Sequence, residues 1–200
     1  MNFEKAIEIA NKELKKKKIK SSVLDCEILM SKAINNNREF IILNSKKKIK
    51  DNSYNHFKKL VYERSKGKPI AYIIGKKYFW KYEFEINEDV LIPRPDTEII
   101  IEQVLNIFKN RSGINFLDIG VGSGCILLSI LKEKKDFLGT GIDMSNECVK
   151  LSKINANKLG VNNRAKIIKS DVDNFNFGKY DLIISNPPYI KKLDLKYLDR

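Results

Sequence analysis

A glycine-rich segment between an apolar strand and an apolar helix constrains the fold of this 200-residue chain more than any other feature. Residues 114–119 are the predicted strand, residues 120–124 (Gly-Val-Gly-Ser-Gly) the loop, and residues 125–133 the predicted helix. In a doubly wound sheet, a glycine turn after the first strand lets the backbone approach a nucleotide. The segment therefore predicts an α/β domain that binds a nucleotide-containing ligand.

The alternation of strand and helix continues beyond this loop. Further strands are predicted over residues 137–142, 165–169 and 180–185, with a helix over 146–159 between the first two of them. Strands that alternate with helices build a parallel sheet with right-handed crossovers and helices on its faces. We therefore expect a Rossmann-like sheet.

Two aspartates indicate which ligand the loop favours. Asp143 ends the second strand, where an acid accepts hydrogen bonds from the ribose hydroxyls of a dinucleotide or of S-adenosyl-L-methionine. The glycines are spaced GxGxG rather than GxGxxG, and Asp118 stands two residues before the first. A carboxylate there opposes a pyrophosphate but suits a cationic sulfonium, which favours S-adenosyl-L-methionine as cofactor. The predicted cofactor contacts of this region are Asp118, Gly120, Val121, Gly122, Ser123, Gly124 and Asp143.

The third strand ends in Ser170-Asp171-Val172. Here a carboxylate can bind the adenine amino group and an apolar side chain can cover the ring, so Asp171 and Val172 are predicted cofactor contacts. The alternative for Asp171 is a residue that caps a turn.

The fourth strand ends in Asn186-Pro187-Pro188-Tyr189, a turn rich in hydrogen-bond acceptors. Two prolines remove two backbone donors, which leaves the Asn186 side-chain oxygen and the Pro187 carbonyl to hold a planar NH2 group. Tyr189 can stack on a flat substrate. In the methyltransferase strand order 3-2-1-4, this turn and the glycine loop face one crevice. We predict direct methyl transfer by positioning, without a metal, with Asn186, Pro187 and Tyr189 catalytic and Pro188 a further substrate contact.

The chain divides by pattern into three parts. Residues 1–75 carry apolar side chains at helical spacing and predict a small all-α domain. Residues 76–95 alternate and are rich in aromatics, which predicts a short β-hairpin linker. Residues 96–200 then hold the methyltransferase domain, whose first helix is expected from Asp96 to about Phe108 because prolines precede it.

The net charge of +13 is concentrated near the N-terminus. Residues 1–80 hold 20 Lys and Arg against 8 Asp and Glu, a net charge of +12, whereas residues 81–200 hold 18 against 17, a net charge of +1. Only six of the 38 basic residues are Arg, and Lys, Asn and Ile share A/T-rich codons. The excess therefore has two interpretations: a solvated surface enriched by codon usage, or a surface that attracts an anionic partner.

Several classes of protein are not expected. The three cysteines, Cys26, Cys125 and Cys148, form no CxxC pair, so neither a disulfide framework nor a zinc site is predicted. No apolar run approaches the roughly 18 residues of a membrane helix, and the N-terminus lacks an apolar signal core. We expect a cytoplasmic protein without a membrane segment.

Five segments of the chain form a combined pattern. They are Arg64 with residues 67–75 (Gly-Lys-Pro-Ile-Ala-Tyr-Ile-Ile-Gly), residues 78–80 (Tyr-Phe-Trp), residues 91–98 (Leu-Ile-Pro-Arg-Pro-Asp-Thr-Glu), the glycine loop, and residues 186–190. Together they resemble the HemK/PrmC family of protein-(glutamine-N(5)) methyltransferases, over about residues 22–192. Segment 91–98 distinguishes this family from other methyltransferases with an Asn-Pro-Pro-Tyr turn.

The resemblance implies an N-terminal domain that docks a class I peptide-chain release factor, and a catalytic domain that methylates the glutamine of its Gly-Gly-Gln motif. By position, residues 120–124, Asp143, Val172 and Asn186 would contact S-adenosyl-L-methionine, and residues 186–189 would hold the glutamine amide. The family often has an aromatic residue where this chain has Val172, which implies weaker stacking on adenine.

Two alternatives stay open. Catalytic domains of this family continue beyond the length of this chain, so we expect a sheet truncated after its fourth strand, with that strand as an exposed edge. An inactive fragment that acts only as a binding module is then one alternative. The other is a nucleic-acid exocyclic-amine methyltransferase, which usually brings a base-flipping pocket and a substrate domain rich in Arg and aromatics. Residues 1–75 offer few of these, so direct nucleic-acid binding is not expected.

Overall fold

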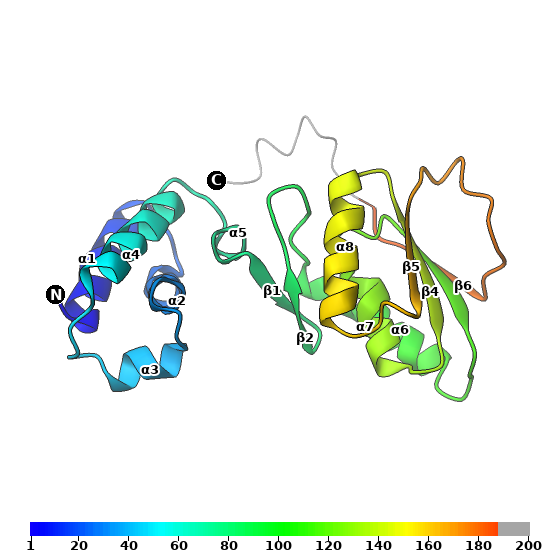
Figure 1. Cartoon of the computed structure of the whole chain (residues 1–200), viewed down its shortest axis with the longest axis horizontal. Helices are drawn as coiled ribbons and strands as arrows, with labels where there is room; N and C mark the ends of the chain where they lie inside the picture. Colours follow the sequence, from blue (N-terminus) through cyan, green and yellow to red (C-terminus); the bar gives the residue numbers. More distant parts are fainter. Residues whose placement is uncertain (188–200) are drawn as a thin grey trace. The chain divides into compact units, whose positions relative to one another are not determined.

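The computed structural model describes residues 1–187, which fall into two compact units (Figure 1). The first unit is Met1–Ile74 and the second begins at Gly75. Each is described by itself below.

The first unit is helical, as its apolar spacing predicts. Its helices are α1 (Phe3–Lys16), α2 (Ser22–Ile34), α3 (Arg38–Leu43), α4 (Asp51–Ser65) and α5 (Ile70–Ile74). Asparagines begin two of them, because the Asn2 side chain accepts a hydrogen bond from the Lys5 N–H and Asn37 accepts one from the Phe40 N–H. The largest side chains that fill the core are Phe3, Leu14, Leu29, Met30, Ile41 and Phe57.

A buried ion pair explains one residue of the motifs found in the sequence. Arg64 Nε donates to Asp25 Oδ2 at 2.7 Å, and the Asp25 side chain is 3% exposed. Arg64 Nη1 also donates to the Lys68 carbonyl oxygen at 3.1 Å, which holds the turn after α4. Arg64 therefore joins α2, α4 and this turn within the helical unit.

The predicted hairpin is formed by β1 (Lys76–Phe79) and β2 (Tyr82–Glu85), paired antiparallel. It belongs to the second unit, where Phe79 and Phe84 join the main core. The turn at Trp80 has φ +56° and is fixed by its side chain, because Trp80 Nε1 and the Tyr82 hydroxyl both donate to Glu133 Oε1 at 2.9 Å.

The second unit contains a four-stranded parallel sheet in the order β5-β4-β3-β6. This is the order 3-2-1-4 expected from the sequence. The strands are β3 (Asn115–Ile119), β4 (Leu138–Asp143), β5 (Ala165–Lys169) and β6 (Leu182–Ser185). Strand β6 begins two residues later than predicted, and within residues 1–187 it lies at an edge of the sheet.

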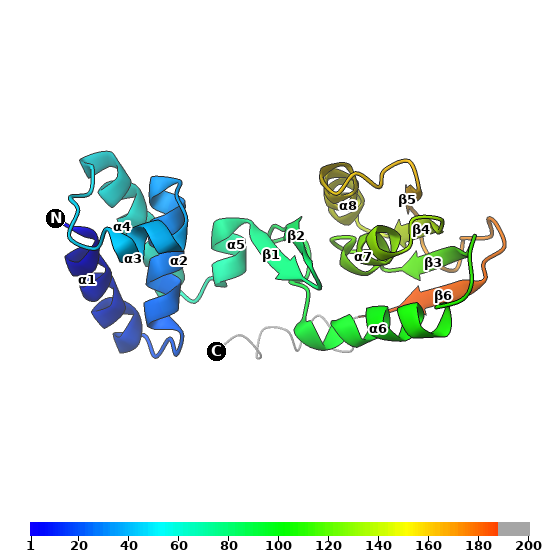
Figure 2. The same cartoon turned by 90° about the horizontal axis from the view of Figure 1, so that it is seen from below.

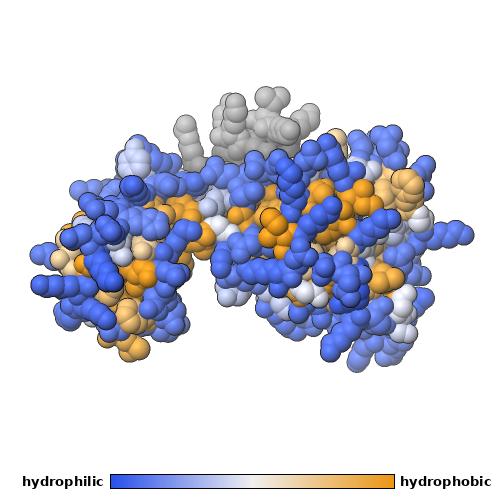
Figure 3. Space-filling view, in the orientation of Figure 1, coloured by the Kyte–Doolittle hydropathy of each residue, from blue (hydrophilic) through white to orange (hydrophobic). Residues whose placement is uncertain are grey.

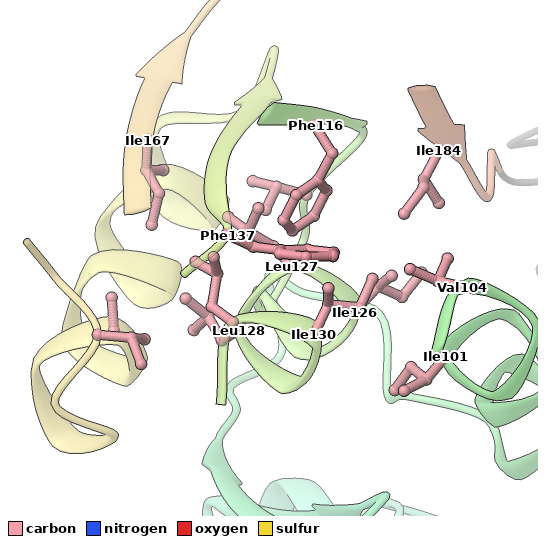
Figure 4. Close-up of a cluster of buried hydrophobic side chains, with 14 of the residues drawn as sticks. Ile101, Val104, Phe116, Ile126, Leu127, Leu128, Ile130, Phe137, Ile167 and Ile184 are labelled. Carbon is pink, nitrogen blue, oxygen red and sulfur yellow. The ribbon is translucent and has the colours of Figure 1, made fainter. Parts of the chain in front are cut away.

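Three helices pack beside this sheet: α6 (Glu98–Ile107), α7 (Cys125–Glu133) and α8 (Asn146–Lys158) (Figure 2). A short 3-10 helix, η1 (Pro95–Thr97), precedes α6, so helical structure starts one residue before the predicted Asp96. Apolar side chains from α6 and α7 meet those of the strands in one cluster, as Figure 4 shows for Val104, Leu127, Phe116 and Ile184. Burial of these side chains holds the strand ends in place.

The visible surface is mostly hydrophilic, with apolar side chains gathered in smaller patches (Figure 3). Among the helices of residues 1–187, we find none with the length and apolar character needed to span a bilayer.

Candidate active site

The glycine loop leaves β3 and enters α7 through three left-handed residues. Gly120, Gly122 and Gly124 have φ of +79°, +53° and +83°, a region that side chains with a Cβ rarely adopt. A Cβ on Gly124 would lie 2.8 Å from Leu128 Cδ1, so this glycine allows the loop to pack on the helix. A Cβ on Gly120 would meet nothing within 4 Å. Gly120 thus leaves an open side on which a ligand can approach the backbone.

Asp143, at the end of β4, holds the loop in shape. The Gly122 N–H donates to Asp143 Oδ2 and the Ser145 N–H donates to Asp143 Oδ1, both at 2.9 Å. A carboxylate has about four lone-pair positions, so two acceptor positions remain for hydroxyl groups of a ligand. The predicted role of Asp143 is compatible with this geometry.

Asp118 lies under the loop. It pairs in register with Gly141, and a Cβ on Gly141 would meet Leu127 of α7, so the Asp118 side chain is on the α7 face of the sheet. Asp118 is 1% exposed, and neither carboxylate oxygen has a hydrogen-bond partner among residues 1–187. Burial raises the pKa of Asp118 to about 7, the nearby Leu127 N–H at the start of α7 partly opposes this shift, and the Asp143 carboxylate adds a smaller upward contribution. Asp118 is therefore a shielded acid beneath the loop rather than an exposed one on it.

The ends of β4 and β5 bring two exposed apolar side chains to the same edge. The Ser170 N–H donates to the Asp143 carbonyl at 3.0 Å, so the residues that follow the two strands leave the sheet together. Met144 is 68% exposed and Val172 is 49% exposed. Both suit an aromatic ring bound next to Asp143. Met144 was not predicted as a site residue from the sequence. Its position directly after Asp143 was the signal that could have indicated it.

Asp171 forms the turn that was the alternative to a cofactor contact. Its Oδ1 accepts a hydrogen bond from the Asp173 N–H at 3.1 Å. This uses one of the two carboxylate oxygens, so the turn and a contact with a ligand are compatible.

The strand order brings the Asn-Pro turn to the glycine loop. The last register pair of β3 and β6 is Ile119 with Ser185, so Gly120 and Asn186 leave the sheet next to each other. Asn186 is half-buried and Pro187 is exposed. Pro188 and Tyr189, the other two predicted residues of this turn, lie outside the described residues.

Residues 90–97 contact the glycine loop at one end, through Val90, and Asn186 at the other, through Thr97. Val90 is 1% exposed and packs with Cys148 and Leu151, and a Cβ on Gly122 would lie 3.9 Å from Val90 Cγ1. At the other end of the segment, Asn186 Nδ2 donates to Thr97 Oγ1 at 3.2 Å. Thr97 was not predicted as a site residue, although it stands in the Pro-Arg-Pro-Asp-Thr-Glu motif.

One cavity lies apart from this site. A cavity of about 440 Å³ opens where the strands begin, lined by residues that include Asn115, Arg164 and Tyr180. Ligands of parallel sheets bind at the carboxyl ends of the strands, which is the opposite edge. Burial raises the pKa of the Cys26 and Cys125 thiols to about 12, so both stay protonated and serve in packing. In the described part of the chain, no three His, Cys, Asp or Glu side chains are grouped to hold a metal ion.

Two family models match this chain. Residues 5–75 match the family model of the PrmC N-terminal domain, and residues 97–198 match that of the methyltransferase small domain. In solved structures, a SAM-dependent methyltransferase from Thiobacillus denitrificans in complex with S-adenosyl-L-homocysteine is 27% identical, with a TM-score of 0.39 over 46% of this chain and 36% of that one.

Two curated relatives cover most of this chain. The release factor glutamine methyltransferase of Leptospira interrogans is 40% identical over 181 residues, which is 88% of this chain and 63% of the relative. That of Buchnera aphidicola subsp. Baizongia pistaciae is 38% identical over 191 residues, which is 94% of this chain and 68% of the relative. The chain thus spans slightly less than two thirds of the Leptospira protein and slightly more than two thirds of the Buchnera protein. On sequence, strand order and loop geometry together, this chain belongs to the release factor glutamine methyltransferase family.

Proposed function

We propose that this chain transfers a methyl group from S-adenosyl-L-methionine to the side-chain amide nitrogen of the glutamine in the Gly-Gly-Gln motif of class I release factors. One observation carries the proposal: Asn186 leaves the sheet beside Gly120, with its side-chain NH2 bound to Thr97. A hydrogen-bond acceptor next to the predicted cofactor loop supports the proposal, because the amide NH2 of a substrate would need one there.

The loop region fits the cofactor. Gly120 offers open backbone, Asp143 keeps acceptor positions for ribose hydroxyls, and Met144 and Val172 offer apolar surface to adenine. When bound, S-adenosyl-L-methionine supplies the methyl carbon, whose bond to sulfur breaks as the bond to the amide nitrogen forms, and the nitrogen gives up one proton. Asp118 beneath the loop adds negative charge that favours a cation above it once it is ionised.

The Asn-Pro turn fits the substrate. The Asn186 side-chain oxygen and the Pro187 carbonyl would each accept one hydrogen of the glutamine NH2. An amide nitrogen is a weak nucleophile because its lone pair is delocalised. Acceptors that hold both hydrogens can direct that lone pair toward the methyl group, and the main catalytic contribution is this positioning. We assign Pro188 and Tyr189 to the same substrate contact on their sequence alone.

The helical unit would bind the release factor. It matches the PrmC N-terminal domain, and residues 1–80 carry a net charge of +12, which favours encounter with an acidic protein surface. Release factors act in translation termination, so the proposed place of action is the cytoplasm.

Methyl transfer tests the proposal directly. The 200-residue chain is incubated with methyl-labelled S-adenosyl-L-methionine and either a release factor, the same factor with Glu in place of the Gly-Gly-Gln glutamine, or total RNA. We expect label in the unmodified factor only. Asn186→Ala should abolish the label and lower the free energy of unfolding by only about 1 kcal/mol, because it removes one side-chain hydrogen bond in a turn after the last described strand. Label in RNA alone, or in both forms of the factor, would overturn the proposal.

A further inference from the structure

We propose that Thr97 is a positioning residue that holds the Asn186 carboxamide in place beside the glycine loop. This inference rests on the proposed function, since it concerns the acceptor that would hold the glutamine amide. The contact that carries it joins Asn186 Nδ2 to Thr97 Oγ1 at 3.2 Å, across 89 residues of sequence.

The Thr97 side chain does not cap the helix that it precedes. It stands at the N-cap of α6, and a threonine there commonly accepts a hydrogen bond from a backbone N–H of the first helical turn. In this structure the Thr97 side chain makes no such bond. Its hydroxyl is therefore available as the partner of Asn186.

The Asn186 side chain has a donor end, Nδ2, and an acceptor end, Oδ1, and rotation by half a turn exchanges them. A substrate NH2 is itself a donor, so only Oδ1 can accept its hydrogen. In the structure Thr97 Oγ1 accepts from Nδ2, which leaves Oδ1 to accept a hydrogen of the substrate. Without the Thr97 hydroxyl the carboxamide loses this anchor and rotates more freely, so Oδ1 is held less often where the substrate needs it.

Thr97 is itself firmly held by hydrogen bonds of its own backbone and of the next residue. Its N–H donates to the Arg94 carbonyl at 3.1 Å, inside a short helix that begins with a proline. The next residue, Glu98, accepts a hydrogen bond at 2.7 Å from the N–H of Trp80, and Trp80 is fixed in turn by Glu133. The hairpin thus anchors the segment that carries Thr97. A fixed hydroxyl can impose an orientation on its partner, whereas a mobile one cannot.

Two substitutions separate positioning from simple structural support. Thr97→Val keeps the shape of the side chain and removes the hydroxyl, and Thr97→Ser keeps the hydroxyl. With a release factor as substrate, we expect Thr97→Val to lower kcat about 5- to 10-fold, the effect of losing one hydrogen bond, with KM changed less than about twofold. Thr97→Ser should restore most of kcat. Thr140→Val, at the chain's other threonine, is the matched control and should leave both constants unchanged.

A second measurement does not depend on activity. In 15N-1H NMR spectra of the chain without cofactor, the Asn186 side-chain NH2 is assigned by its loss in Asn186→Asp. We expect Thr97→Val to shift this signal and to speed its exchange with water, and Thr97→Ser to leave it near its original place. An unchanged NH2 signal in Thr97→Val, or kcat equal to that of the parent, would overturn the inference. If the parent chain does not methylate the release factor, the proposed function fails, while the NMR comparison still decides whether Thr97 holds Asn186.

Discussion

Asp143 and Gly122 are joined across the ends of two neighbouring strands, with the Gly122 N–H donating to Asp143 Oδ2 at 2.9 Å. The other carboxylate oxygen accepts a hydrogen bond from the Ser145 N–H at the same distance. One side chain therefore shapes the glycine loop and begins the turn into α8. Since it still has acceptor capacity, it can also bind a ligand that lies on the loop.

Replacement of Asp143 by alanine should weaken S-adenosyl-L-methionine binding at least tenfold. The change removes acceptors for the ribose hydroxyls and releases the Gly122 N–H, and hydrogen bonds to a charged group contribute roughly 1.5–3 kcal/mol each. Calorimetry measures the affinity. Asp136→Ala is the matched control, because Asp136 Oδ2 also accepts a backbone N–H, that of Gly113, just before the strand rather than after it. Equal losses in the two variants would contradict a specific role for Asp143.

Gly120→Ala should also abolish cofactor binding, for a steric reason. Gly120 and Gly160 have similar left-handed φ, +79° and +68°, and a Cβ on either would meet nothing within 4 Å. Alanine at each position should therefore cost about 1 kcal/mol of stability from backbone strain. The added methyl group at position 120, unlike that at position 160, would occupy the space through which the ligand approaches the backbone. The unfolding temperatures of the two variants are measured with and without cofactor. If the cofactor still raised the unfolding temperature of Gly120→Ala, the proposed position of the cofactor on this loop would be wrong.

The free energy of unfolding should depend on pH through Asp118. Its pKa is about 7 in the folded chain and near 4 when unfolded, so between these values the folded state binds more protons. Stability from this group is then highest at low pH and falls as pH rises from about 4 to about 7, by a few kcal/mol in all. Asp118→Asn removes this slope and keeps the size of the side chain. Urea unfolding at pH 5 and pH 8 measures the change in the free energy of unfolding of parent and variant. If this change were the same in both, Asp118 would not be the group responsible.

Glu133→Ala should loosen the hairpin. Glu133 accepts hydrogen bonds from Trp80 Nε1 and the Tyr82 hydroxyl, and its carboxylate pairs with Lys81. Burial alone would raise its pKa, but these three donors lower it. Truncation leaves two half-buried donors unpaired, which costs about 2–4 kcal/mol.

Fluorescence of Trp80, the single tryptophan, reports this change during urea unfolding. We expect an emission maximum at longer wavelength and a lower unfolding midpoint. Glu102→Ala, at an exposed position of α6, is the control and should stay within about 0.5 kcal/mol of the parent. A midpoint equal to that of the control would show that the Glu133 contacts do not stabilise the hairpin.

Local patterns in the sequence were sufficient for the sheet. Helix α7 runs over the predicted residues 125–133, and the four strands lie within two residues of their predicted bounds. The strand order was expected because the glycine loop and its acids indicated a methyltransferase, whose usual order is 3-2-1-4, and the structure has this order. The placement of Asn186 beside the glycine loop followed from that order.

The roles of individual side chains were harder to predict. Phe116 and Asp118 share one face of β3 by alternation, but parallel strands are apolar on both faces, so the pattern does not tell which face the helices cover. The structure has α7 on that face, which buries Asp118 instead of exposing it to a ligand. Arg64 likewise looked like part of a motif and is half of a buried ion pair.

The sequence by itself determined the parallel sheet, the glycine loop and the turn at Asn186, because glycine, proline and hydrophobic spacing act over a few residues. Only the tertiary structure decided that Thr97 holds Asn186 and that Glu133 holds the hairpin, over separations of 89 and about 50 residues. Such contacts depend on which surfaces pack together. A side chain's partner is then chosen by the geometry of the whole unit rather than by its neighbours in sequence.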